Sequence, residues 1–408
     1  MGAAIVTALA VAAAGFSSQT EVWLSVAGCA RYNALSRVKH GSVIVKISKS
    51  LPLWSVASPV VAWLLIAGQA LGAPALIGPS YTLLLVAGLF AGVLAAVFHA
   101  EVVAHKVGEP YGTLVLAIAV TAIEVALIVS LMIAGGESTA GLARDTVFAA
   151  VMIILNGMLG LCLLAGAKRH GEQTFTLSGV SAALTTLAAI SILTMVLPNY
   201  TTTVPGPAYS SSQLGFIALV SIVLYGTFVL VQTVRHRDYF LPEVAINDED
   251  THAPPPPLKM TWLAAALLLA CLASVVLLAK LLSPTLEATV LKLGAPKAVV
   301  GIIIAAVVLL PEGIAAFHAA RANRLQTSLN LALGSALASI GLTIPAVAIV
   351  SLMTGWTLSL GIDVKSTVLL LLSLLVATLS LGTGRTTVMQ GTVHLVIFAV
   401  YLFTAIVP

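Results

Sequence analysis

The sequence predicts an all-α protein that crosses a membrane about eleven times. Of its 408 residues, 59% are hydrophobic and only 8% are charged, and the mean hydropathy is +1.08. A soluble domain carries about 25% charged residues, so most of this chain is expected to be in contact with lipid or with other parts of the protein and not with water. Its apolar runs are continuous, as in helices of about 20 residues that span a bilayer. They do not alternate with polar residues as the strands of a membrane barrel do.

The expected helices follow the apolar runs in chain order. They lie at 51–71, 81–100, 112–134, 146–167, 178–198, 213–234, 260–282, 297–319, 326–353, 366–382 and 390–407. We expect a break near Pro345 in the ninth of them. Between the sixth and the seventh, residues 235–259 form a long polar stretch with the acidic run Asp248–Asp250. The four residues Pro254–Pro257 favour an extended linker here.

The first 50 residues form an N-terminal extension to which the sequence assigns no defined order. Residues 26–29, Val-Ala-Gly-Cys, look like a lipoprotein cleavage box, but no Lys or Arg precedes them, and a secretion signal begins with such charges. A loosely ordered start, or one that continues an upstream segment, fits better than a lipid anchor. The three cysteines, Cys29, Cys162 and Cys271, are far apart and indicate neither a disulfide framework nor a metal site.

The basic residues report orientation in the membrane. With eleven spans, fourteen of the 19 Lys and Arg residues fall on the N-terminal side. Without the first 50 residues the division is still nine against five. Cytoplasmic loops carry the excess of Lys and Arg, so we expect the N-terminus and the linker to lie in the cytoplasm and the chain in the inner (plasma) membrane. The net charge of +4 is scattered over loops, so the expected partners are lipids and not nucleic acid. The sequence does not specify an oligomeric state.

A repeated motif divides the chain into two halves. Residues 101–110 read Glu-x-x-x-x-Lys-x-Gly-x-Pro, and residues 287–296 repeat these four residue types at the same spacing. A span with a single acidic residue follows each copy, and Glu124 and Glu312 come 23 and 25 residues after the first Glu of their copies. The alternative is a coincidence between two loops, but four unlike residue types and the later glutamate all agree.

The two copies are expected to be inverted relative to each other. They precede the third and the eighth spans, and a separation of five spans gives opposite orientations. Inverted repeats are common in secondary transporters, which bind their cargo near the bilayer midplane between the repeats. We therefore expect an extra first helix at 51–71, a first repeat of five helices at 81–234, a cytoplasmic linker at 235–259 and a second repeat at 260–408.

Glu124 and Glu312 lie near the centres of their spans. An ionisable side chain there costs roughly 2.5–3.5 kcal/mol, and such residues usually serve transport. Glu312 follows Pro311, which lacks an N–H and can free carbonyl groups one turn earlier. The alternative is a pair of protonated glutamates that only hydrogen-bond inside the bundle, but the repeat places one in each half.

Two such carboxylates suit the exchange of cations for protons. Ca²⁺ takes six to eight oxygen ligands at about 2.3–2.6 Å, and two carboxylates supply up to four of them. When empty, two close carboxylates in a low dielectric cannot both stay ionised, so they should titrate as a coupled pair. Cation binding and protonation then exclude each other. The expected ligands are the transported Ca²⁺, or Na⁺ and K⁺, and H⁺; no cofactor is expected.

Other residues are candidates to support this site. Neighbouring polar groups, carbonyls and water would complete the ligands, and Asn156 is a candidate ligand. Small residues also allow helices to approach closely, which is the alternative role for Gly334 and Ser335. His318 could relay protons or be an ordinary interfacial histidine. The full set of supporting candidates is Thr121, Asn156, Pro311, Gly334, Ser335, Ser339 and His318.

A separate metal site at His99, Glu101 and His105 is not expected. Their spacing does not place all three on one face of a helix, and the second copy of the motif lacks both histidines.

The chain resembles bacterial calcium/proton antiporters of the ChaA type, within the calcium/cation antiporter superfamily. The resemblance runs from about residue 51 to the end. The stretches that carry it are Gly108–Glu124, Leu310–Gly313, Asn323–Leu325, Leu329–Ala336 and Arg235–Phe240. Members of this family have two repeats, each with an essential membrane glutamate, and an acidic linker between the halves. The resemblance implies that Glu124 and Glu312 carry the cation and the proton.

The chain departs from the wider family at these glutamates. The usual Gly-Asn-x-x-Glu pattern is absent from both repeats, and Gly313 replaces a histidine beside the second glutamate. ChaA-type relatives are associated with Na⁺ and K⁺ as well as Ca²⁺, so the cation stays open. Two other functions are weighed: a cation channel, which usually needs several chains or rings of charge, and an intramembrane enzyme, for which we find no nucleophile or metal cluster.

Overall fold

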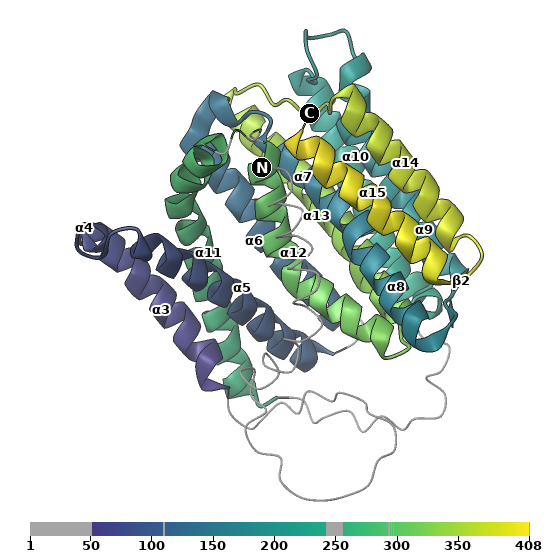
Figure 1. Cartoon of the computed structure of the whole chain (residues 1–408), viewed down its shortest axis with the longest axis horizontal. Helices are drawn as coiled ribbons and strands as arrows, with labels where there is room; N and C mark the ends of the chain where they lie inside the picture. Colours follow the sequence, from purple (N-terminus) through teal and green to yellow (C-terminus); the bar gives the residue numbers. More distant parts are fainter. Residues whose placement is uncertain are drawn as a thin grey trace, which may run out of the picture. The chain divides into compact units, whose positions relative to one another are not determined.

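The computed structural model describes residues 51–108, 111–241, 256–292, 294, 296 and 298–407. The N-terminal extension 1–50, with its cleavage-box-like residues 26–29, lies outside the described residues. Most of the linker, including the acidic run Asp248–Asp250, also lies outside them. Leu53–Pro408 form one structural unit, which Figure 1 shows as a helical bundle.

The first half of the bundle contains six expected spans. Its single helices are α3 (Leu53–Ala70), the short α4 (Ala73–Ile77), α5 (Ser80–Val107) and α6 (Tyr111–Gly135), followed by a 3₁₀ turn, η1 (Gly136–Thr139). The next three spans contain π-helical turns: α7 (Leu142–Met152), η2 (Ile153–Met158) and α8 (Leu159–His170); α9 (Leu177–Ser191), η3 (Ile192–Val196) and the 3₁₀ turn η4 (Leu197–Tyr200); α10 (Ser211–Leu230) and η5 (Val231–Arg235). A 3₁₀ turn, η6 (Arg237–Tyr239), follows.

The second half contains five long helices. They are α11 (Leu258–Lys292), α12 (Ala298–Arg321), α13 (Leu325–Thr354), α14 (Val364–Leu381) and α15 (Val388–Ile406). Side chains fix several helix starts: Ser210 and Gln213 form a capping box at α10, and Thr387 and Gln390 form one at α15. One antiparallel pair of two-residue strands joins the halves, with β1 (Gln173–Thr174) beside β2 (Arg385–Thr386).

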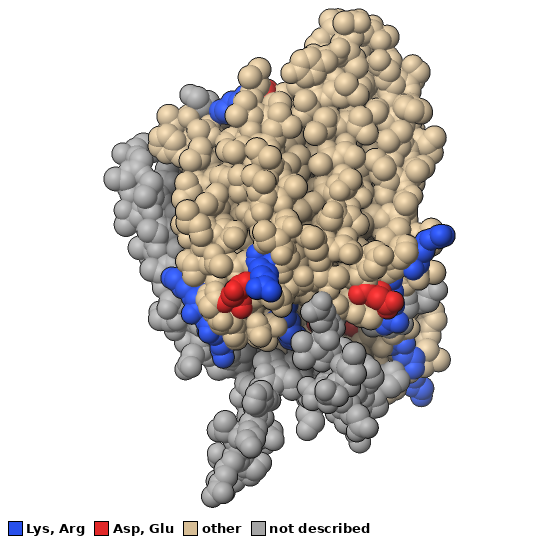
Figure 2. All heavy atoms as spheres, turned by 90° about the vertical axis from the view of Figure 1, so that its right-hand side faces the viewer, with Lys and Arg blue, Asp and Glu red and all other residues tan. Residues whose placement is uncertain are grey.

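The predicted all-α, polytopic fold is confirmed. Ten helical stretches of the described chain are long and apolar enough to cross a membrane, and α6 adds the shorter apolar segment Ala117–Ile133. Figure 2 shows one face on which charged side chains gather toward one end and leave a wide uncharged band. This band is what a lipid-facing surface requires, because charges are costly within the hydrocarbon.

Two sequence expectations need correction, and two features of the structure were not predicted. The expected break near Pro345 is wrong, because α13 runs unbroken for 30 residues; neighbouring helices can satisfy the carbonyl that a proline leaves free. The motif beginning at Glu101 is not a loop, since α5 continues to Val107, and α11 likewise includes Glu287 and ends at Lys292. The π-helical turns and the β1–β2 pair leave no periodic signal and were not predicted.

The motif's glycines and lysines have a local structural role at these helix ends. Gly108 closes α5 with φ 77°, and its N–H donates to the Ala104 carbonyl over 2.9 Å. Gly294 has the same kind of conformation, with φ 69°. Glycine adopts positive φ without a steric penalty. Lys106 and Lys292 lie in the last turns, where a positive charge interacts favourably with the helix dipole.

The helices of the two halves pack against each other reciprocally. Helix α5 lies along α11, and α3 packs against both, as Figure 1 also shows. Helix α6 packs against α13, while α12 packs against α7 and α8; α10 packs against α13, while α15 packs against α8. The main apolar core is built from α6 to α10 and from α12 to α15, and α11 packs in two smaller clusters with α5. This interleaving places α6, α12 and α13 together, where the two glutamates lie.

Candidate functional site

Helix α13 joins the two glutamates. Ser339 Oγ donates a 2.6 Å hydrogen bond to Glu124 Oε1 on α6, and Ser335 Oγ donates to Glu312 Oε2 on α12. The two serines are four residues apart, so they lie one above the other on one face of α13. The site therefore contains two carboxylates and two hydroxyls from three helices.

Neither glutamate of the pair has a basic partner among the described residues. Glu124 is 3% exposed, and Glu312 is half-buried. Pro311 is buried inside α12, and because it has no N–H the Val307 carbonyl lacks its usual partner one turn earlier. A cation could therefore find carboxylate, hydroxyl and carbonyl oxygens here, which are the ligands that hard cations prefer.

A cavity of about 360 Å³ reaches Glu312 from one end of the bundle. We call this end the linker end, because α10 approaches the linker there and α11 leaves it. Its walls come from the end of α5, the start of α6, the end of α10 with η5 and η6, and facing turns of α12 and α13. Its lining residues include Glu101, Tyr225, Gln232, Arg237, Glu312 and Asn330. Glu124 does not line this cavity and lies deeper in the protein.

Five supporting candidates from the sequence lie at or beside the pair. Ser335 and Ser339 contact the glutamates directly, and Pro311 and Gly334 line the cavity together with Ser335. Thr121 is buried on α6, three residues before Glu124 and so on the same face.

Two supporting candidates lie elsewhere. Asn156 is fully buried in η2, where its Nδ2 donates to Ser373 Oγ over 2.8 Å and its Oδ1 lies 3.4 Å from His394 Nδ1. It thus joins a polar cluster with α14 and α15. His318 is exposed near the end of α12, with its ring edge-on to Phe317. Neither hydrogen-bonds to a glutamate within the described chain.

The residues beside Glu101 do not form a metal site. His99 is buried, and its Nε2 lies 2.9 Å from the Ser55 carbonyl on α3, whereas Glu101 is exposed and lines the cavity. The described residues contain no group of three or more metal-ligating side chains. Tyr225 on α10 and Gln232 on η5 also line the cavity. The sequence did not predict this part of the wall, because one tyrosine and one glutamine in an apolar run give no distinguishing signal.

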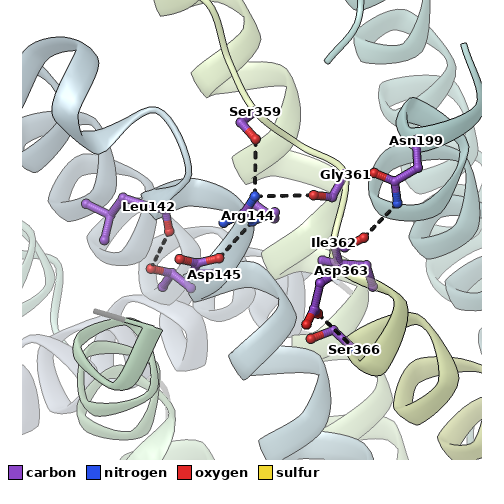
Figure 3. Close-up of polar contacts among 10 residues, drawn as sticks. Leu142, Arg144, Asp145, Asn199, Ser359, Gly361, Ile362, Asp363 and Ser366 are labelled. Atoms are coloured by element: carbon purple, nitrogen blue, oxygen red, sulfur yellow. Dashed lines mark hydrogen bonds and ion pairs between the residues drawn. The ribbon is translucent and has the colours of Figure 1, made fainter. Parts of the chain in front are cut away.

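At the opposite end of the bundle, residues 355–363, which connect α13 to α14, are held by hydrogen bonds to the first half of the chain. Figure 3 shows Arg144 at the start of α7 donating to Asp145 Oδ1 (2.8 Å), Ser359 Oγ (3.1 Å) and the Gly361 carbonyl (3.2 Å). Asn199 Nδ2 donates to the Ile362 carbonyl over 2.6 Å. A second cavity of about 300 Å³ at this end is lined by Asp145, Asp363 and Tyr401 among others, and neither glutamate lines it.

Comparison with known proteins agrees with this architecture. The family described as "Sodium/calcium exchanger protein" matches residues 77–234 and 263–407, the two halves on either side of the linker. The chain belongs to this family. The protein y4hA of Sinorhizobium fredii is 52% identical over 366 residues, which cover 88% of this chain and 98% of that protein.

Two further known proteins are similar to this chain over most of their own length. The sodium-potassium/proton antiporter ChaA of Escherichia coli is 36% identical over 79% of this chain and 87% of its own length, which agrees with the resemblance read from the sequence. The crystal structure of an H⁺/Ca²⁺ exchanger, CAX, matches with a TM-score of 0.62 at 17% identity, over 85% of this chain and 89% of that one. At this identity the match shows a shared fold. The family member described here is thus a multi-pass membrane protein with the fold of a solved exchanger.

Proposed function

We propose that this protein is a secondary cation/proton antiporter that exports Ca²⁺, or alternatively Na⁺ and K⁺, in exchange for H⁺. One observation carries the proposal: two glutamates from different helices, each in an otherwise uncharged apolar run, meet the same face of α13 through Ser335 and Ser339. The names of its relatives, ChaA among them, support a cation/proton antiporter. The family is one of exchangers, which leaves the intramembrane-enzyme alternative without support.

The chemistry of exchange follows from competition for the same oxygens. The glutamates supply up to four carboxylate oxygens and the serines two hydroxyl oxygens, close to the six to eight that Ca²⁺ takes. Ionised, the pair cancels the charge of Ca²⁺; protonated, it is neutral without a cation. Either loaded form is close to electroneutral, so it can move between the two sides, whereas an empty ionised pair in low dielectric is costly.

Inverted repeats at 81–234 and 260–408 would allow this site to face either side in turn. Under this correspondence α13 is equivalent to α7–α8, and α10 to α15. The cavity at the linker end is lined by the start of α13 and the end of α10, and the cavity at the other end by the start of α7 and the end of α15. These corresponding elements at opposite ends support the assignment of two inverted repeats.

The same proposal includes orientation and location. With the N-terminus and linker in the cytoplasm of a plasma membrane, the cavity that reaches Glu312 opens to the cytoplasm and residues 355–363 close the outer end. The described conformation is then inward-facing. Helix α3 is the extra helix outside the repeats, and the lipid bilayer is the surrounding partner.

The decisive experiment measures proton movement driven by each cation. Everted membrane vesicles are acidified inside, an acridine dye reports the gradient, and Ca²⁺, Na⁺ and K⁺ are added in turn. We expect at least one cation to release the dye quench in vesicles with this protein and not in vesicles lacking it. A steady cation conductance that does not depend on the proton gradient would instead establish a channel.

Removing the hydroxyls of Ser335 or Ser339 is expected to weaken cation affinity. A hydrogen bond to a charged group contributes about 1.5–3 kcal/mol, so Ser335→Ala or Ser339→Ala should raise the half-saturating cation concentration by about tenfold or more. The measurement is the cation dependence of the initial rate of dye release. Ser328→Ala is the control, since Ser328 is buried on the same helix and hydrogen-bonds to neither glutamate. Equal affinities in all three variants would remove the serines from the site.

A further inference from the structure

Glu101 is a position of the internal motif, repeated as Glu287 in the second copy, that neither helix capping nor the proposed glutamate pair explains. The glycines and lysines of the motif serve the ends of α5 and α11, as described above. Glu101 lies six residues before the end of α5 at Val107, and its side chain is exposed. It lines the same cavity as Glu312. The motif therefore places a third carboxylate on the route between the linker end and the glutamate pair.

The cavity wall has few charges. Among the described residues that line it, only Glu101, Glu312 and Arg237 are charged; aromatic, aliphatic and neutral polar residues make up the rest. Apolar walls focus the field of the charges they enclose, which raises the local concentration of counter-ions. A carboxylate at this position therefore acts on a passing cation more strongly than it would on an open surface.

Glu101 has no competing structural partner among the described residues. It forms no ion pair there, with Arg237 or with any other basic residue. The neighbouring His99 points away to the carbonyl of Ser55 on α3. Arg237, on η6, lines the same cavity. Its positive charge opposes the negative potential of Glu101, so the balance between the two charges sets how strongly the cavity attracts cations.

We infer that Glu101 is an access residue, which concentrates the exchanged cation in the linker-end cavity and passes it to Glu312. The inference rests on the proposed antiport function and adds to it. Glu101 acts through Glu312 as a positioning residue and is not one of the two groups that alternate between cation and proton. Its loss should therefore change the apparent affinity for the cation and leave the maximal rate of exchange near that of the parent protein.

The valence of the cation gives this inference a quantitative signature. Removing one negative charge changes the electrostatic potential of the cavity by a fixed amount, and the Boltzmann factor for a divalent ion is the square of that for a monovalent ion. If Glu101→Gln raises the half-saturating concentration about threefold for a monovalent cation, it should raise it about ninefold for a divalent one. Added inert salt should shrink both effects by screening.

The first experiment compares the removal of two exposed carboxylates, one that lines the cavity (Glu101) and one that does not (Glu172). Initial rates are measured in everted vesicles for the parent protein, Glu101→Gln and Glu172→Gln. Glu172 is also exposed, and it pairs weakly with Arg385 at 3.6 Å outside the cavity. We expect a three- to tenfold rise in the half-saturating concentration for Glu101→Gln alone, because one charge supplies only part of the roughly 10- to 1,000-fold effect that a charged cleft can have.

A second experiment tests charge separately from shape. Glu101→Cys is made in a Cys29→Ser background; Cys162 and Cys271 are buried and out of reach of impermeant reagents. A methanethiosulfonate that adds a sulfonate should restore the parent affinity. One of similar size that adds a quaternary ammonium should weaken affinity further, and prior labelling should not lower the maximal rate in the sulfonate case.

Three outcomes would overturn the inference. They are an unchanged half-saturating concentration in Glu101→Gln, a fall in maximal rate with unchanged affinity, and equal effects of the two thiol reagents. Each of these outcomes can be interpreted only if the parent protein itself exchanges cations in the same assay. Absence of exchange in the parent itself would instead defeat the proposed function, so the two failures are distinguishable.

Discussion

Replacing Glu312 by glutamine is expected to abolish cation-driven proton movement. Glutamine keeps the size of the side chain and can still accept the hydrogen bond from Ser335 Oγ. It carries no ionisable proton and cancels no cation charge, so the exchange cycle loses both of its half-reactions. We expect the initial rate of dye release to fall at least about 100-fold, which corresponds to about 2.7 kcal/mol.

Glu124→Gln is expected to have the same effect for the same reason. Ser339 Oγ can donate to the glutamine Oε1 as it does to the carboxylate, so the local packing of α6 against α13 is preserved. The equivalence of the two variants is a specific consequence of a shared site. If Glu124→Gln retained full exchange, the two-glutamate mechanism would be wrong, and Glu312 alone would have to carry the cation.

The control for both variants is a glutamate away from the site. Glu172→Gln removes an exposed carboxylate whose ion pair with Arg385 lies at the surface, where such pairs contribute about 0–1 kcal/mol. Its exchange rate should equal that of the parent protein. All three variants should elute as a single species in detergent, which separates a lost site from a lost fold.

The fold was largely predictable because its signals are long and repeated. Each expected span agrees with a helix of the structure to within a few residues, apart from the extensions of α5 and α11. Continuous apolar runs that must satisfy their own backbone hydrogen bonds in lipid leave helices as the only solution. The choice of Glu124 and Glu312 also needed only the sequence, since a lone acid in an apolar span is conspicuous. Their role as the exchange site stays a prediction.

The arrangement of side chains around the site could not be predicted to the same degree. Asn156 illustrates why: it lies in the π-helical turn η2, which adds one residue to the helix and rotates the following side chains by about 100°. The rotation accompanies its placement toward Ser373 and His394 instead of the glutamates. No sequence pattern announces such a turn, and the cavity at the linker end depends on tertiary packing of α10, which periodicity does not report.

The packing of α15 against α8 allows a second large effect to be predicted, on stability. A Cβ at Gly391 would lie 2.5 Å from the Leu164 backbone nitrogen and 2.9 Å from the Gly160 carbonyl oxygen. These are backbone atoms, so neither can move aside without separating the two helices. Small residues permit this close approach in membranes. Overpacking usually costs about 1–3 kcal/mol and occasionally more, so Gly391→Ala should lower the Tm by roughly 2–10 °C.

A larger side chain should convert this loss into a failure to fold. Gly391→Leu places four carbons where one already meets the backbone, so we expect little monodisperse protein after extraction in detergent. Gly226 on α10 provides the matched control, because a Cβ there meets nothing within 4 Å and the position is exposed. Gly226→Ala and Gly226→Leu should keep or slightly raise the Tm, since both residues favour helix over glycine. A Gly391→Leu protein with the parent Tm would mean that α15 does not pack on α8 as described. The reciprocal pairing of α15 with α8 and of α10 with α13, which supports the proposed inverted repeat, would then fail.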